Sequence, residues 1–132
     1  MEAYQIKAKC VAVFGLLAGF FWGLDPLIRT LVVLIVLDIL TGLAVGYIRQ
    51  EIHSDASRKG MVKKALILVL VGAAHTFNAT QPLGFDAASG VAGFFALTEL
   101  ISIIENCANV GVPIPPALTR ALSSITKGTE KQ

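Results

Sequence analysis

The sequence predicts an all-α integral membrane protein, most simply a bundle of four transmembrane helices that assembles into an oligomer. Hydrophobic residues make up 55% of the 132 residues and charged residues only 15%, whereas a soluble domain carries roughly 25% charge. The apolar residues fall in four runs, and three of these approach the roughly 20 residues that a spanning helix needs. A buried soluble bundle is the alternative, but three such runs in so short a chain disfavour it.

The first predicted helix covers about residues 8–24. It is short for a span unless the side chains of Lys7 and Lys9 extend to the lipid headgroups. An interfacial or tilted first helix, followed by three spans, is therefore the alternative to four spans. Pro26 separates this helix from the next one, because proline cannot continue a helix.

Three further apolar runs predict helices at about 27–48, 61–79 and 87–106. The segment 49–64 is the one long polar stretch between them, and Pro82 and Gly84 indicate a short turn before the last helix.

The C-terminal part follows a proline-rich turn, GVPIPP. We expect a short surface helix at about 117–126 and a flexible tail at 127–132. No internal repeat is visible, so residues 1–132 are expected to form a single membrane domain.

Basic residues predict the orientation of the helices in the membrane. If four helices span, ten of the eleven lysines and arginines lie on one side, and only Arg29 lies on the other. Both termini and the 49–64 loop are therefore expected in the cytoplasm. The residues of this cytoplasmic basic signal are Arg49, Arg58, Lys59, Lys63 and Lys64.

Two carboxylates, Asp38 and Glu99, are expected near mid-membrane at a similar depth. A charged group there costs at least about 2.5–3.5 kcal/mol. Lys63 and Lys64 lie at the inner edge of their run, so no basic partner is expected. The carboxylates would be neutral and hydrogen-bonded, would share a proton, or would face water in an assembled lumen. The polar residues predicted at a pore or helix interface are Asp38, Thr41, Glu99, Ser102, Glu105 and Asn106.

Glycines at a spacing of four residues predict close helix packing. Gly42 and Gly46 share a helix face with Asp38. Gly15, Gly19 and Gly23 form a second series on the first helix. Spacing does not decide whether this packing is within one chain or between chains.

The sequence contains no catalytic constellation, and we expect neither an enzyme nor a bound cofactor or metal. His53 and His75 have no nucleophile or metal-binding pattern around them. Cys10 and Cys107 would both lie near the reducing face and are expected to be free thiols. The basic residues before the third helix are read as a contact to anionic lipid rather than as a nucleic-acid site.

Three segments resemble the bacteriophage holin family of the toxin-secretion and phage-lysis type. They are LDILTG at 37–42, SRKGMVKKALIL at 57–68 and ELISIIENCANVGVPIP at 99–115. The third is the most specific, because Glu99, Glu105, Asn106, Gly111, Pro113 and Pro115 all match the pattern of that family. The resemblance covers roughly 27–118.

This resemblance implies a phage protein of the host cytoplasmic membrane, surrounded by lipid, that assembles with copies of itself. The resulting lesions release an endolysin without a required direct contact, and some relatives support export of large toxins. The tail is less charged than in many holins. The methionine after Met1 is Met61, so a short antiholin made from a second nearby ATG start is not expected, and timing control would need another gene or another device.

Two other functions stay open on the sequence. A small ion or proton channel could use Asp38 and Glu99, although no inverted repeat supports a transporter. A passive membrane anchor or assembly partner for a larger machine is the second alternative.

Overall fold

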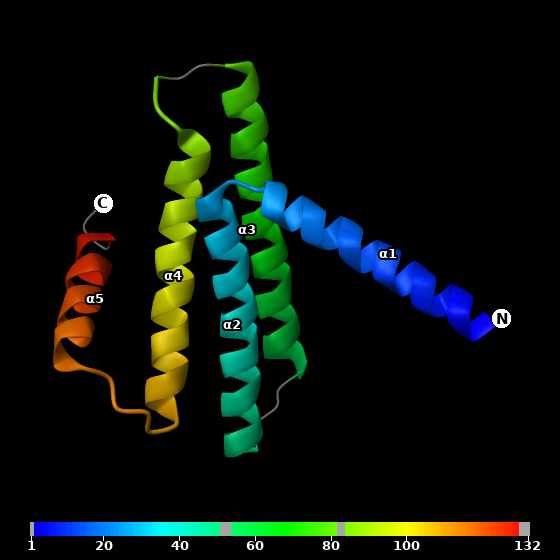
Figure 1. The fold of residues 1–132 in the computed structure, drawn as a ribbon. Helices are drawn as coiled ribbons and strands as arrows, with labels where there is room; N and C mark the ends of the chain where they lie inside the picture. The colour runs from blue at the N-terminus through cyan, green and yellow to red at the C-terminus, as the bar shows by residue number, and fades with distance from the viewer. Residues whose placement is uncertain (1, 51–53, 82–83, 130–132) are drawn as a thin grey trace.

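The computed structural model describes residues 2–50, 54–81 and 84–129, and these ranges form five α-helices without any strand (Figure 1). Four of the helices are long and apolar enough to cross a membrane. The predicted all-α membrane class is therefore confirmed. The helices are α1 (Glu2–Gly23), α2 (Pro26–Arg49), α3 (Ser54–Thr80), α4 (Ala87–Asn109) and α5 (Pro116–Thr129).

Helix α3 begins at Ser54, earlier than the apolar run that marks it in the sequence. Its first turns carry polar residues that the sequence pattern assigns to a loop. Polar side chains do not prevent a helix from forming where it extends beyond the membrane into water. The segment of α3 that is apolar enough to span is Arg58–Thr80.

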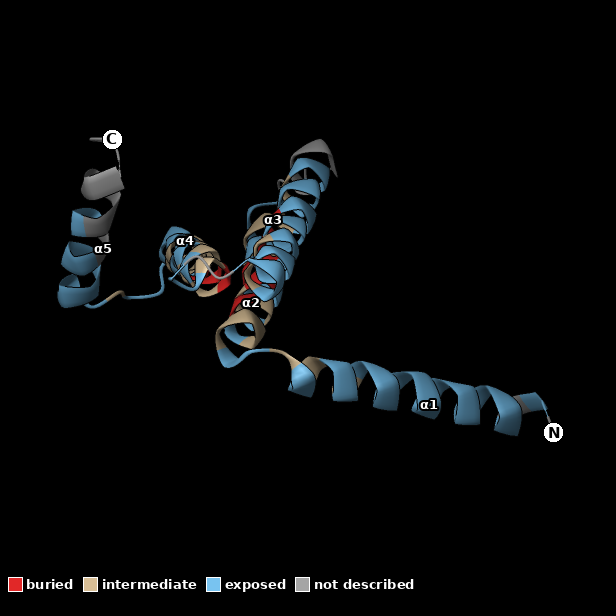
Figure 2. Cartoon of the chain, turned by 90° about the horizontal axis from the view of Figure 1, so that it is seen from above, coloured by how far each residue is buried: buried red, intermediate tan, exposed pale blue. Residues whose placement is uncertain are grey.

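Helices α2, α3 and α4 lie side by side, and α4 packs against both of the others (Figures 1 and 2). Helices α2 and α4 run in one direction and α3 runs in the opposite one. We call the two ends of this bundle the Asp25 end and the Arg49 end. The apolar core consists of Leu31, Ile35, Ile67, Val71, Ala92 and Ala96.

The core places small side chains of α4 against branched side chains of α2. Ala92 and Leu31 are both completely buried. In lipid, helices associate mainly through close van der Waals contact, which small residues permit. The alanines therefore make α4 the central helix of the bundle.

Helices α1 and α5 stand away from the bundle in both views (Figures 1 and 2). No described residue of α1 is buried, although Tyr4–Gly23 is long and apolar enough to cross a membrane. A side chain added at any glycine of the α1 series would meet nothing within 4 Å. Within one chain, these glycines therefore pack against no other helix; packing against a second chain stays a prediction. The glycines of this series are Gly15, Gly19 and Gly23.

Aspartates cap two helices at the Asp25 end. The Asp25 carboxylate accepts a hydrogen bond from the backbone N–H of Leu27 at 2.9 Å. Asp86 accepts one from the backbone N–H of Ser89 at 3.0 Å, another from the Ser89 hydroxyl, and a third from the Asn78 side-chain amide. These hydrogen bonds hold the pKa of Asp86 below its usual value. Asp86 therefore ties the end of α3 to the start of α4.

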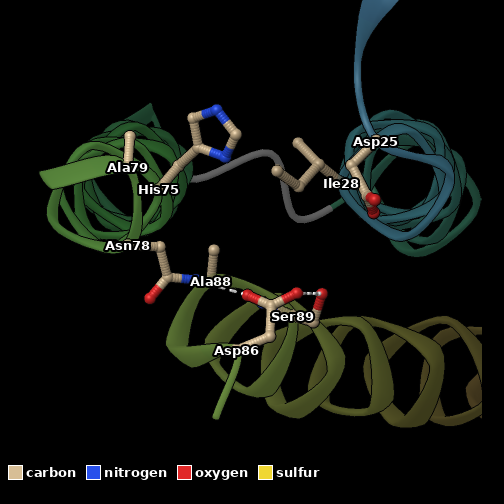
Figure 3. Close-up of a pocket in the computed structure, with 8 residues that line it drawn as sticks. All are labelled: Asp25, Ile28, His75, Asn78, Ala79, Asp86, Ala88 and Ser89. Carbon is tan, nitrogen blue, oxygen red and sulfur yellow. Dashed lines mark hydrogen bonds between the residues drawn. The ribbon is translucent and has the colours of Figure 1, made fainter. Parts of the chain in front are cut away.

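A cleft of about 280 Å³ opens at this end between α2, α3 and α4 (Figure 3). His75 of α3 and Ile28 of α2 reach into the space between their helices, above the cap of α4. Within the described ranges, no three His, Cys, Asp or Glu side chains are grouped closely enough to hold a metal ion. The cleft is lined by Asp25, Ile28, His75, Asn78, Ala79, Asp86, Ala88 and Ser89.

Replacing Asp86 should destabilise the α3–α4 hairpin in a pH-dependent way. Asp86→Ala should lower the melting temperature at neutral pH, and Asp86→Asn should lower it less. Because folding lowers the pKa of Asp86, its contribution is present above the unfolded pKa and is lost as the pH falls through the folded value. Circular dichroism melts in detergent at pH 7 and at acidic pH test this. The gap between wild type and Asp86→Ala should narrow in acid, and Glu105→Ala serves as the control.

Candidate functional site

One polar cluster joins all three helices of the bundle at its centre. Its charged members are Asp38, Lys64 and Glu99, and we call it the ion cluster. Asp38 of α2 and Glu99 of α4 are 8% and 4% exposed, and they are the buried charged side chains among the described residues. Between them lies the ammonium of Lys64 from α3. Its Nζ is 2.7 Å from Asp38 Oδ2 and also donates to Glu99 Oε2. A single cation therefore bridges two buried carboxylates on two different helices.

The expectation that these carboxylates lack a basic partner is wrong. Lys64 lies six residues beyond Arg58, where the apolar part of α3 begins, which corresponds to about 9 Å along the helix. The methylene chain of lysine can lie along apolar surface while its ammonium reaches a polar group. In this protein the ammonium turns inward to the carboxylates instead of outward to the headgroups.

Asn106 and Thr41 complete the hydrogen bonding of the cluster. The Asn106 side-chain amide donates to Asp38 Oδ1 at 3.0 Å and to the Thr41 hydroxyl oxygen at 3.1 Å. The Thr41 hydroxyl in turn donates to the Asp38 backbone carbonyl at 3.1 Å. Among the described residues, no buried side-chain nitrogen or oxygen lacks a hydrogen-bond partner. The polar groups are therefore satisfied within one chain.

Gly42 lies beside Asn106 at the level of the cluster. A Cβ placed on Gly42 would lie 3.7 Å from Asn106 Nδ2, an ordinary van der Waals distance, so the cluster does not require a glycine at this position. One face of α2 thus contacts α4 within the same chain. Toward the Arg49 end, the Arg49 guanidinium donates to the Asn109 backbone carbonyl at 2.9 Å. This contact satisfies one of the free carbonyls at the end of α4.

The other residues predicted for a pore, for helix packing or for the basic signal do not contribute to the cluster. Ser102 and Gly46 are half-buried, whereas Glu105 is exposed. The remaining basic side chains of α3 that were predicted as a signal are also exposed. They are Arg58, Lys59 and Lys63.

The sequence predicts Lys64 only as part of the topology signal and does not reveal its pairing. In the structure, Lys64 precedes Ile67 and Val71, which are buried residues of α3, by three and seven positions. That spacing puts all three on one helix face, so Lys64 points to the core and its neighbour Lys63 does not. The apolar run of α3 does not indicate which of its faces is buried, so the pairing becomes visible only in the folded chain.

Removing the shared cation should strongly destabilise the bundle. Breaking a buried ion pair by removing one partner costs about 3–5 kcal/mol, because the other charge is left uncompensated. We expect Lys64→Met to lower the free energy of unfolding by about this amount. The triple variant Lys64→Met, Asp38→Asn, Glu99→Gln should recover most of the loss.

The measurement is unfolding of the detergent-solubilised protein, followed by circular dichroism as the mole fraction of SDS rises. Lys63→Met is the matched control, because it removes an exposed lysine at the neighbouring position. Equal stability of the Lys63→Met and Lys64→Met proteins would show that the ion cluster does not hold the bundle together.

Comparison with known proteins identifies the family. The sequence profile of the bacteriophage holin family matches residues 15–127, which extends beyond the three resembling segments. An uncharacterized protein of Clostridium perfringens is 38% identical over 128 residues, which are 95% of each chain. An uncharacterized protein of Listeria monocytogenes is 37% identical over 107 residues, covering 80% of this chain and 76% of the relative.

A relative with a functional name is the probable holin of Bacillus phage phi105. It is 26% identical over 114 residues, covering 86% of this chain and 84% of the phage protein. No solved structure matches the chain. The family match includes the whole of α2, α3 and α4, and with them every residue of the ion cluster. This chain belongs to the bacteriophage holin family.

Proposed function

We propose that the protein is a holin, which assembles in the host cytoplasmic membrane and opens lesions through which an endolysin reaches the cell wall. The observation that carries this proposal is the family match over residues 15–127. It is supported by four helices able to span a membrane. Endolysin needs no direct contact with the protein in this scheme, because it only has to pass through the lesion.

The arrangement of the cluster suggests how the chain accumulates without leakage. Asp38, Lys64 and Glu99 satisfy one another inside the bundle, while large apolar side chains cover its outer faces. A chain in this closed state offers lipid an apolar surface and offers ions no polar path. Examples of these outward side chains are Val33, Leu40, Leu43, Leu66, Val69 and Phe94.

Opening then requires the cluster to exchange its internal ion pairs for water. Helices α2 and α3 both pack on α4 but contact each other little in the described chain. The ion pair of Lys64 with Asp38 is one link between them, and the shared apolar core is another. We infer that α2 and α3 separate when copies assemble, so that the charged groups line a water-filled lumen. Water and neighbouring copies would compensate the charges that the closed bundle compensates internally.

The basic residues support an orientation with both termini and the α2–α3 connection in the cytoplasm. Arg49 and Arg58 flank that connection at the Arg49 end, whereas Arg29 lies near the opposite end. Labelling of single cysteines introduced at the two ends of the bundle would test this orientation.

Passage of folded protein should distinguish a holin from the two other functions. Purified protein reconstituted in liposomes at high density should release an encapsulated endolysin as well as a small dye. Ion flux without release of the enzyme would identify a small channel, and no leakage of any kind would identify an anchor. Either result would overturn the proposal. Empty liposomes and liposomes with an unrelated helical membrane protein are the controls.

Neutralising the cluster should impair lysis without preventing insertion. The triple variant Lys64→Met, Asp38→Asn, Glu99→Gln keeps the size and much of the hydrogen bonding of the cluster, but it cannot line a lumen with charge. In cells that carry an endolysin, it should accumulate in the membrane at the wild-type level and lyse late or not at all. Lys63→Met is the control. Lysis by the triple variant at the wild-type time would exclude a role for the charges in opening.

A further inference from the structure

A second recess lies at the corner where α1 meets α2, apart from the ion cluster. It has a volume of about 340 Å³, and Figure 1 shows the corner at the Asp25 end of α2. It is lined by Phe21, Trp22, Arg29, Thr30, Val33 and Leu34. We call this recess the corner groove. Its walls are apolar except at one end, where Arg29 and Thr30 lie.

Arg29 forms no salt bridge with a carboxylate of the described residues. Its guanidinium stacks on the ring of Trp22, 4.9 Å from the ring centroid. The acidic residue one turn earlier, Asp25, uses its carboxylate to cap α2 at Leu27. No ion pair of Arg29 with another described residue is present. The hydrogen-bond donors of Arg29 are therefore not engaged by a carboxylate of the described residues and can bind an anion from outside the chain.

The position of this charge corresponds to the headgroup level of a membrane. Arg29 follows Pro26, the first residue of α2, by three positions, which is about 4.5 Å along the helix. Tryptophan is enriched at the same level, because its ring is apolar and its N–H is polar. From Arg29 the groove continues along Val33 and Leu34, toward the middle of the apolar helix.

We propose that the corner groove binds an anionic phospholipid, with the lipid phosphate on Arg29 and an acyl chain along Val33 and Leu34. The planar guanidinium fits a phosphate through paired hydrogen bonds. The groove offers no carboxylate for the ammonium of a zwitterionic headgroup, which favours lipids such as phosphatidylglycerol. A free phosphate ion would use Arg29 but would leave the apolar walls uncovered. The site does not depend on lesion formation.

Trp22 makes the site directly measurable, because it is the only tryptophan in the chain. The full-length protein is reconstituted in vesicles of phosphatidylcholine and phosphatidylglycerol at one fixed ratio. Bromine, which quenches tryptophan on contact, is placed on the acyl chains of one lipid or of the other. A basic residue near an anionic surface contributes about fivefold in lipid affinity. We therefore expect brominated phosphatidylglycerol to quench Trp22 about fivefold more effectively per mole than brominated phosphatidylcholine.

Three variants make the test specific. Arg29→Gln should abolish the preference while leaving quenching by brominated phosphatidylcholine intact, which also shows that the variant has inserted. Arg29→Lys keeps the charge without the planar donor pair and should give an intermediate preference. Arg49→Gln, at the opposite end of α2, should behave as wild type.

Equal quenching by the two lipids in the wild-type protein would overturn the proposal, and so would a full preference in Arg29→Gln. Inorganic phosphate is added at constant ionic strength to separate the lipid from a free anion. The preference should persist. Loss of the preference with phosphate, but not with chloride, would identify a site for small anions instead of a lipid site. If the lipid-site proposal fails by any of these outcomes, the endolysin-release result is unaffected, because the two experiments test different sites.

Discussion

The ammonium of Lys64 lies between two carboxylates in a place where a lone charge would be expensive. Asp38 and Glu99 belong to different helices, and each is nearly inaccessible. In hydrocarbon, a charged side chain without a partner costs several kcal/mol. The shared cation therefore requires α2, α3 and α4 to be present together and in one register. Asn106 and Thr41 occupy further hydrogen-bonding positions around Asp38, so the cluster is complete within a single chain.

The packing of the bundle follows from this requirement. A polar cluster of this kind needs close helices, and small residues provide the space. The buried alanines of α4 let α2 approach, and Gly42 lies beside the Asn106 amide at this level. Helices α2 and α3 have less direct backbone contact, so they are held together by α4, by the shared apolar core and by Lys64. The ion cluster holds the closed bundle together, and its ion pairs would break when the helices separate.

The parts outside the bundle have a different physical basis. No residue of α1 whose burial is described is buried, so its apolar side chains need lipid or another chain around them. Arg29 and Trp22 at its junction with α2 contact each other, and both types of side chain suit the headgroup region. The ion cluster therefore compensates charges inside the bundle, whereas the corner groove lies where the chain meets the surrounding membrane.

The all-α membrane class, the four apolar helices and the resemblance to holins could all be predicted, because run length, composition and motif residues are local properties of the chain. Pro26 is a local feature too, and it predicted the break before α2. Other features became visible only in the folded chain: Lys64 pairs with Asp38 and Glu99, α1 projects from the bundle, and Gly42 lies beside Asn106. These contacts depend on how helices rotate and shift against one another. That arrangement is set by packing between residues far apart in the chain, which no single apolar run encodes.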